Sequence, residues 1–373
     1  MITMADILRS YGPDYIAQYH NEMLPSHQRA INDIIQCRTP ALGGHVYKCP
    51  DHDQFDYKYH SCMNRHCPQC QNDQATIWLY NEQQRLINVN YFLVTFTLPS
   101  ELRPIARSNQ KLFYHLLFSQ SWRVMQKLAS NPRWLGGYIG ALGVLHTWTR
   151  TMTFHPHVHY LVPAGWLNDD NSIWVKAQDK FFLPVKALSR VFRAMFRDAL
   201  QQLAPELFRE IPQEVWRKCW VVHAMPAGNG NAVLKYFAPY VFRVAISNKR
   251  IIKLENGLVT FLYRHPETKR WTPMTLPVFE FIRRFLQHVL PRGLKKVRHF
   301  GLLSAKNKHV LVLLQYKLGT VEIEPPVKQE PDSKVPHCSI CGNAMILIEI
   351  VPPGGFAVRA NDHNPPEKQI RAP

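Results

Sequence analysis

Two pairs of cysteines, each with a two-residue spacer, constrain this sequence most, because a metal ion held by such pairs dictates the fold around it. They are Cys67-Pro-Gln-Cys70 and Cys338-Ser-Ile-Cys341. Eight cysteines placed at random along the 373 residues would give about 0.2 such pairs, so the spacing is not accidental. Zn²⁺ takes Cys and His ligands in a tetrahedron, commonly as two chelating pairs. The sequence therefore predicts a small zinc-stabilised module.

The ligands that we expect for a structural Zn²⁺ lie near the N-terminus. Cys49-Pro-Asp-His52 has the same spacing as the downstream pair, so the expected set is Cys49, His52, Cys67 and Cys70, with Cys62 as the first substitute. The pair Cys338 and Cys341 is typical of half of a second zinc knuckle, but its other half is not evident. His337 and His363 are candidates, and so is the absence of any metal. Cys219 has no evident partner, and we expect it in the core.

The charge balance favours a polyanionic partner. Lys and Arg number 45 against 27 Asp and Glu, a net charge of +18 at pH 7, which attracts nucleic acid. Aromatic residues at 12% can stack on the bases of single strands. The charged start and the lack of a long apolar run indicate neither a signal peptide nor a membrane partner. We expect a cytoplasmic, nucleoid-associated bacterial protein, whose reduced thiols bind metal.

Four regions are expected from the composition and periodicity. Residues 1–75 form a zinc-binding domain, 85–255 an alternating strand and helix domain, 256–320 a basic extension of that domain, and 321–373 a linker, the Cys knuckle and a disordered tail. Strands are predicted at 91–99, 143–148, 157–162 and 220–225. Helices are predicted at 183–204, 232–244 and 277–290, with one or two more within 100–130.

A histidine triplet in a predicted strand is a candidate metal site. Alternate strand residues share a face, so His157 and His159 project together, and His155 has the same parity. About 0.9 such triplets are expected by chance, so the strand context carries the argument. If 144–150 and 155–162 form a hairpin, His146 lies opposite His159 and adds a third ligand. The alternative is a set of hydrogen-bonded core histidines.

Two tyrosines follow on a predicted helix. Tyr236 and Tyr240 are four residues apart, so both hydroxyls lie on one face. A phenol with a pKa of about 10 attacks phosphate only with help from a metal or a cation, and Lys235 and Arg243 are nearby cations. The alternative is that the two rings only pack. Further phosphate contacts are expected from two basic clusters, comprising Lys249, Arg250, Lys295, Lys296 and Arg298.

Taken together, these motifs resemble the rolling-circle HUH transposases of the insertion sequence 91 family. The resemblance covers roughly residues 25–350 and rests on segments 37–46, 61–71, 144–148, 155–163 and 236–248. His52 stands where the family usually has a cysteine, and Pro239 precedes the second tyrosine.

The resemblance implies an α+β fold, in which a small N-terminal zinc-binding domain precedes an HUH nuclease with an RRM-like or ferredoxin-like antiparallel sheet. It implies Mg²⁺ or Mn²⁺ at His157 and His159, and nucleophilic tyrosines at Tyr236 and Tyr240. The implied activity is nicking and rejoining of single-stranded DNA at element ends, with transfer to target DNA. The alternatives are a rolling-circle replication initiator or relaxase, and a non-catalytic zinc-dependent DNA-binding protein.

Overall fold

A five-stranded antiparallel sheet is the centre of the molecule. The computed structural model describes residues 2–70, 72–168, 173–242, 245–321 and 335–355. The strand order is β12-β4-β5-β3-β8. The strands are β3 (Tyr91–Thr97), β4 (Gly140–Trp148), β5 (Phe154–Pro163), β8 (Val222–Pro226) and β12 (Val297–Gly301). Strands were therefore predicted correctly at four places, and β12 was not foreseen.

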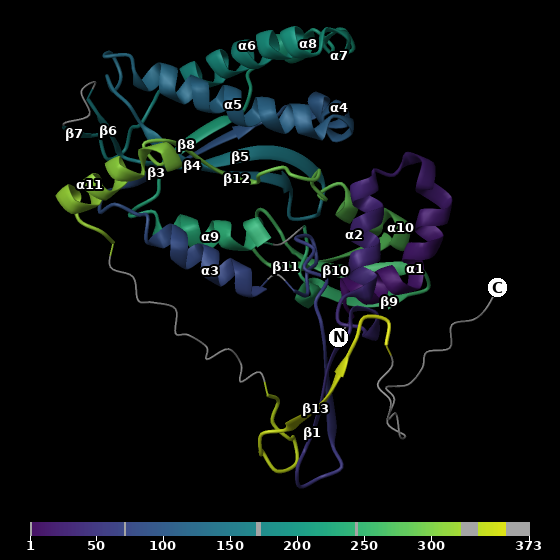
Figure 1. Ribbon diagram of the computed structural model, residues 1–373. Coiled ribbons are helices and arrows are strands. Elements are labelled where there is room, and N and C mark those ends of the chain that lie inside the picture. Colours follow the sequence, from purple (N-terminus) through teal and green to yellow (C-terminus); the bar gives the residue numbers. More distant parts are fainter. Residues whose placement is uncertain (1, 71, 169–172, 243–244, 322–334, 356–373) are drawn as a thin grey trace.

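Helices cover both faces of this sheet (Figure 1). One face carries α4 (Arg103–Ser108), α5 (Gln110–Ala129) and α6 (Val185–Leu203), with the short α7 (Pro205–Arg209) and α8 (Glu214–Arg217) beyond them. The opposite face carries α3 (Asn72–Gln83) and α9 (Asn231–Phe242).

Successive side chains of β5 point alternately to the face covered by α5 and α6 and to the face covered by α9. Val158 and Tyr160 belong to the core under α5 and α6, whereas Leu161 packs with the α9 residues Leu234 and Phe237. The odd-numbered histidines of β5 share the parity of Leu161 and therefore lie on the α9 face. The α+β class with an antiparallel sheet and covering helices is confirmed.

A second, smaller unit joins the two halves of the chain. Helices α1 (Met4–Tyr19) and α2 (Pro25–Gln36) pack on α10 (Val278–Leu286) and on a three-stranded sheet. That sheet has the order β11-β10-β9 and consists of β9 (Ile251–Glu255), β10 (Leu258–Arg264) and β11 (Trp271–Pro277). The expected 256–320 extension is thus divided: residues to α10 pack against the N-terminal helices, and β12 returns to the central sheet.

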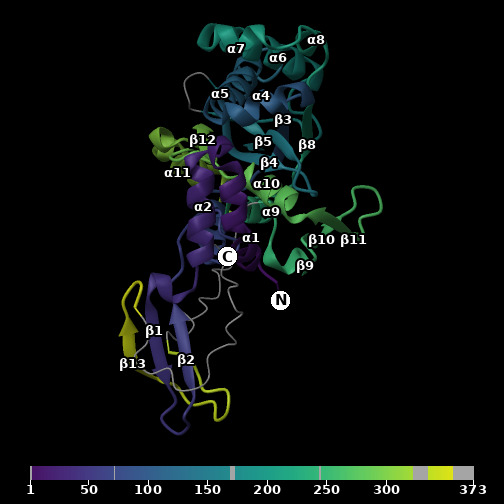
Figure 2. The ribbon, with the colours of Figure 1, turned by 90° about the vertical axis from the view of Figure 1, so that its right-hand side faces the viewer.

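An elongated arm projects from this body (Figure 2). It holds β1 (Gly44–Lys48), β2 (Phe55–Tyr59) and β13 (Ile346–Val351) in the order β13-β1-β2. Residues 335–355 therefore do not form a separate knuckle but complete the N-terminal hairpin, which corrects the expected boundaries of the first and last regions.

The remaining elements are peripheral to the site. The strands β6 (Gly165–Leu167) and β7 (Trp174–Lys176) form a ribbon, and α11 (Lys308–Leu318) follows β12. Short 3₁₀ turns comprise His20–Glu22, Pro40–Leu42, Ser100–Leu102, Asn248–Arg250 and Ala305–Asn307. Within the described ranges, no helix combines the length and apolarity that crossing a membrane requires.

Candidate metal centres

Three histidines converge on the α9 face of the central sheet. His146 of β4 and His157 and His159 of β5 each offer a ring nitrogen, and these atoms lie within 4.8 Å of one another. His146 pairs with His157 rather than with His159, because the turn at residues 149–153 and an irregularity after His146 set the register. The register expected from the sequence was therefore off by two residues. A shift of two keeps a side chain on its face, so His146 still joins the cluster.

Hydrogen bonds to the Nδ1 atoms orient two of these rings. The Nδ1 of His157 donates to the carbonyl oxygen of His155 at 2.6 Å, which leaves the Nε2 lone pair free. The Nδ1 of His159 lies 2.7 Å from the hydroxyl of Thr95 on β3. Such outer contacts fix the ring orientation of metal-binding histidines.

His146 supplies the test of whether a cation fits. Its ring is fully buried, and neither of its nitrogens has a hydrogen-bond partner among the described residues. A buried polar atom without a partner costs about 1–3 kcal/mol, and a coordinated cation would remove that cost. The three residues therefore fit a divalent cation better than they fit a set of hydrogen-bonded core histidines.

Burial also keeps the three imidazoles neutral. It holds the pKa of His146 and of His157 well below the usual value, with a further contribution from the neighbouring His159, and it lowers the pKa of His159 to about 4. The neutral imidazole is the form that coordinates a metal.

Both tyrosines of α9 lie against the histidines. The ring of Tyr240 stacks on His146 with centroids 4.1 Å apart and an interplanar angle of 6°, and on Trp148 at 5.3 Å. The ring of Tyr236 lies 5.9 Å from His146 and 6.0 Å from His159, and its side chain is 42% exposed. Partial burial and then the neighbouring Tyr240 raise the pKa of Tyr236 above its usual value.

The helix that carries the tyrosines is anchored by its buried face. Leu234 and Phe237 pack under the sheet, and their spacing leaves Tyr236 and Tyr240 together on an adjoining face. Pro239 lies inside α9, which the structure describes as far as Phe242, and residues 243 and 244 lie outside the described residues. The predicted helix at 232–244 is therefore confirmed up to Phe242.

Lys296, which was expected to contact DNA phosphates, lies beside the tyrosines of this site. It is buried, its Nζ donates a hydrogen bond to the carbonyl oxygen of Tyr240, and it lies 4.5 Å from the ring centre of Trp148. Burial lowers its pKa to about 7. This buried position beside Tyr240 does not favour its expected role as a DNA phosphate contact. Arg298 was also expected to contact DNA phosphates. Its guanidinium instead lies over Phe118, on the face of the sheet opposite to the histidines and tyrosines.

A basic groove runs along α9 towards the tyrosines. It has a volume of about 790 Å³ and is lined by Arg38, Lys235 and Lys249, among other residues. A hollow of about 160 Å³ contains Trp148, Tyr240 and Arg250, and it shares Pro239 and Ser247 with the groove.

The other expected DNA contacts differ in their surroundings. Lys235, Lys249 and Lys295 are exposed. The guanidinium of Arg250 donates to the carbonyl oxygens of Leu262, Ala245 and Arg150, so this arginine ties chain segments together. Arg243 lies outside the described residues.

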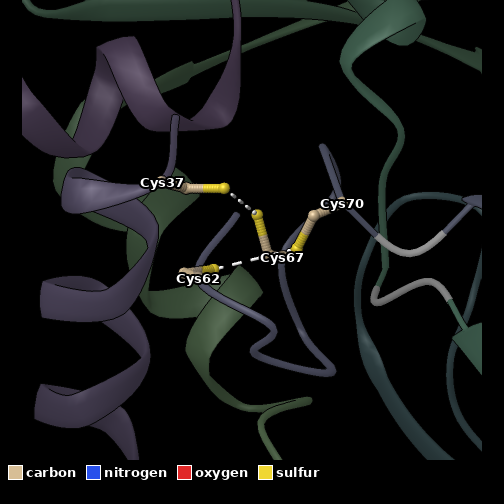
Figure 3. A group of neighbouring side chains, drawn as sticks. All are labelled: Cys37, Cys62, Cys67 and Cys70. Atoms are coloured by element: carbon tan, nitrogen blue, oxygen red, sulfur yellow. Dashed lines mark hydrogen bonds between the residues drawn. The ribbon is translucent and has the colours of Figure 1, made fainter. Parts of the chain in front are cut away.

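Four cysteines form a cluster where α2 meets the loop after β2 (Figure 3). They are Cys37, Cys62, Cys67 and Cys70, with Sγ to Sγ distances of 3.6 Å for Cys67 to Cys37 and 3.8 Å for Cys62 to Cys70. A tetrahedral zinc with Zn–S bonds of about 2.3 Å requires sulfurs about 3.8 Å apart. A disulfide would need about 2.05 Å. The cluster fits a structural Zn²⁺.

The zinc ligands expected from the sequence are therefore paired wrongly. Cys67 and Cys70 belong to the cluster with Cys37 and Cys62, whereas Cys49 and His52 lie beside Cys338 and Cys341. The reason is the hairpin: Cys49 and His52 lie in the turn at its tip, and Cys67 follows the strand that returns to its base. Strands of five residues separate tip from base by about 17 Å.

Three further expectations concern isolated residues. His337 forms a backbone bridge with Ala344 and does not belong to either cysteine cluster. His363 lies outside the described residues. Cys219 is exposed and not part of the core.

Comparison with known proteins assigns two parts of the chain. The family described as "Transposase zinc-binding domain" matches residues 7–98, and the family described as "Putative transposase" matches residues 140–309. The second match contains the three histidines and both tyrosines, and the first contains the Cys37 cluster.

Two relatives extend over most of the chain. "Putative transposase y4qJ" of Sinorhizobium fredii (strain NBRC 101917 / NGR234) is 39% identical over 321 residues, which cover 81% of this chain and 80% of that protein. "Transposase for insertion sequence element IS801" of Pseudomonas savastanoi pv. phaseolicola is 28% identical over 74% of this chain and 69% of that protein. No solved structure matches.

Proposed function

The chain belongs to the insertion sequence 91 family of transposases, and on that basis we propose that it nicks and rejoins single-stranded DNA at insertion-element ends through 5′-phosphotyrosine links. One observation carries the proposal: two tyrosine rings on α9 lie against three histidines whose ligand atoms are within 4.8 Å of one another. A nucleophile and a cation site on a shared face are what metal-assisted phosphoryl transfer requires.

The three histidines would hold Mg²⁺ or Mn²⁺. Imidazole suits Mn²⁺, and Mg²⁺ prefers oxygen ligands, so DNA phosphate oxygens and water would complete either shell. When bound, the cation polarises the scissile phosphate and stabilises the leaving 3′ oxygen. Thr95 and the carbonyl of His155 keep the two β5 rings turned for this purpose.

The chemical step is a transesterification. The phenolic oxygen of a tyrosine bonds to phosphorus, the bond from phosphorus to the 3′ oxygen breaks, the phenol loses its proton to solvent and the 3′ oxygen gains one. A free 3′ hydroxyl reverses the step and joins a new strand, so no phosphodiester is lost to hydrolysis. We assign the first link to Tyr236, because it is exposed while the ring of Tyr240 is stacked against both His146 and Trp148.

The basic groove would guide the DNA strand to the tyrosines. Lys235 and Lys249 can contact phosphates, and Trp148 lies with Tyr240 in the adjoining hollow, where a base can stack. A single strand suits this arrangement, because its bases are unpaired and can stack on a ring.

The test is a covalent adduct on a denaturing gel. The protein is incubated with single-stranded and duplex DNA of element ends in Mn²⁺. We expect a slower band of protein linked to the single strand, and its loss in Tyr236→Phe/Tyr240→Phe. Tyr316→Phe, at an exposed tyrosine of α11, is the matched control and should keep the band. DNA binding without any adduct, over a range of end sequences, would instead indicate a non-catalytic DNA-binding protein.

A further inference from the structure

A second group of metal ligands lies at the tip of the arm, formed by residues from opposite ends of the chain. We propose that Cys49, His52, Cys338 and Cys341 bind a second Zn²⁺, which fastens residues 335–355 to the hairpin β1–β2. Neither matched family region includes the C-terminal pair, since they span residues 7–98 and 140–309. The proposal does not depend on the nuclease chemistry.

The interatomic distances fit a zinc ion. The Sγ of Cys49 lies 3.7 Å from that of Cys341, and the Nδ1 of His52 lies 3.5 Å from the Sγ of Cys49 and 3.9 Å from that of Cys338. Tetrahedral bonds of about 2.3 Å to sulfur and about 2.0–2.1 Å to nitrogen place sulfurs about 3.8 Å apart and a sulfur about 3.6 Å from the nitrogen. Cys49 and Cys338 are 1% and 3% exposed, whereas His52 is half-buried and Cys341 is exposed, so the site is open to solvent on one side.

Each half of the cluster is shaped by a tight turn. The backbone N–H of Cys49 donates to the carbonyl oxygen of Gln54 at 2.9 Å. On the other side, the N–H of Cys338 donates to the carbonyl of Asn343 at 2.8 Å, and Gly342 adopts a φ of 77°, which glycine tolerates. Both turns therefore present their ligands before any metal arrives.

Side chains connect the two turns across the cluster. The amide of Asn343 donates to the carboxylate of Asp51 at 2.7 Å, and the amide of Gln54 donates to the hydroxyl of Ser339 at 2.7 Å. These four residues lie next to the ligands in sequence. Their bonds hold the two chelating pairs face to face, so the convergence of the ligands does not rest on the sulfurs alone.

The arm has little else to stabilise it. The buried cluster of the arm contains Tyr47, Cys49, Cys338 and Met345, and two of these four are proposed ligands. The apolar residues of β13 are mostly exposed, including Ile346, Leu347, Ile348 and Ile350. Units of fewer than about 40 residues usually need a metal, a disulfide or a partner to fold. Three thiolates and one imidazole in a tetrahedron select Zn²⁺.

Metal content gives the first test. All proteins in this test carry His157→Ala, so that zinc at the three histidines is not counted; purified with excess zinc and then desalted, this full-length background should contain two zinc ions per chain. The variant Cys338→Ser/Cys341→Ser should contain one, and Cys219→Ser, at the exposed cysteine outside both clusters, should keep two. Unchanged zinc content in the double variant would overturn the proposal.

Hydrogen exchange tests the fastening of the arm. We expect the amides of β13 to lose protection in the double variant, while those of α2, next to the Cys37 cluster, keep theirs. Full protection of β13 in a variant that has lost one zinc would refute the fastening role.

If the serine variant does not fold, a second variant that keeps four ligands at the site still tests the proposal. In the same His157→Ala background, His52→Cys converts three sulfurs and one nitrogen into four sulfurs and should keep two metals per chain. In the cobalt-loaded protein it should increase the thiolate-to-cobalt charge-transfer absorption, because one thiolate is added. An unchanged cobalt spectrum would show that residue 52 is not a ligand. Neither readout uses DNA cleavage, so the nuclease proposal can fail without affecting this result.

Discussion

The buried ammonium group of Lys296 should make the stability of this protein depend on pH in a defined direction. Burial lowers its pKa to about 7 in the folded state, against about 10.4 in an unfolded chain. Between these values the unfolded state binds more protons than the folded state. The free energy of unfolding therefore rises with pH from about 7 to 10, with a slope that approaches ~1.4 kcal/mol per pH unit.

The substitution Lys296→Met keeps most of the side-chain volume and removes the titrating group. The stability of the variant relative to the native protein should be greatest near pH 7 and fall by about 1.4 kcal/mol per unit up to pH 9. A constant loss of about 0.5–1.5 kcal/mol for the hydrogen bond to Tyr240 is superimposed on this slope, because the folded-state amine is largely neutral above pH 7. The charged or titratable neighbours of the ammonium are the same in both proteins, namely Arg65, His66, His146 and His288.

The measurement is denaturant unfolding at pH 7, 8 and 9, followed by far-ultraviolet circular dichroism without added Mg²⁺ or Mn²⁺. Lys295→Met, at the exposed neighbouring lysine, is the control, and its difference from the native protein should not change with pH. If the curves for Lys296→Met and the native protein run parallel from pH 7 to 9, the ammonium is not held in a dry environment and the reasoning fails.

Three further predictions concern the nuclease site. Tyr240→Phe should still form one protein–DNA link through Tyr236 but not complete strand transfer, as read from adduct and product bands; loss of every adduct would contradict the assigned order. His157→Ala should lower DNA cleavage by at least about 100-fold while a gel shift shows unchanged DNA binding, because distant cations supply most of the affinity. An equal loss of cleavage and of DNA binding would exclude His157 as a ligand of the catalytic metal. Lys235→Gln and Lys249→Gln should each reduce the salt slope of single-strand binding by about 0.7, whereas Lys186→Gln on α6 should leave it unchanged, and an equal effect of all three would argue against the groove.

Local periodicity explains what the sequence predicted well. The helix at 183–204 and the hairpin containing His146 and His157 follow from spacings of residues that are near neighbours in the chain. The register of that hairpin was predicted two residues away from the observed one: the turn was expected near Met152-Thr153, but it spans 149–153, and an irregularity after His146 shifts the pairing further. Because alternate strand residues face the same side, a shift of two residues leaves His146 on the face of His157 and His159, and the predicted histidine cluster is unchanged.

Contacts between distant segments explain what the sequence did not predict. The partner of Cys49 is 292 residues away at Cys341, and spacing rules report only on ligands that are close together. Lys296 reaches Tyr240 because the unforeseen strand β12 follows it and joins the edge of the sheet beside β4. The parity of Thr95 on β3 was a usable signal for its contact with His159, since both face the same side.

The strand order β13-β1-β2 has a consequence for how the arm comes into being. One of the two neighbours of its middle strand β1 is the following strand β2, whereas the other, β13, is synthesised about 300 residues later. Throughout translation one edge of β1 is open, and it can be closed only by joining segments about 300 residues apart. Pairing across so long a separation has a high contact order, so the three-stranded sheet of the arm cannot be completed until β13 has been synthesised.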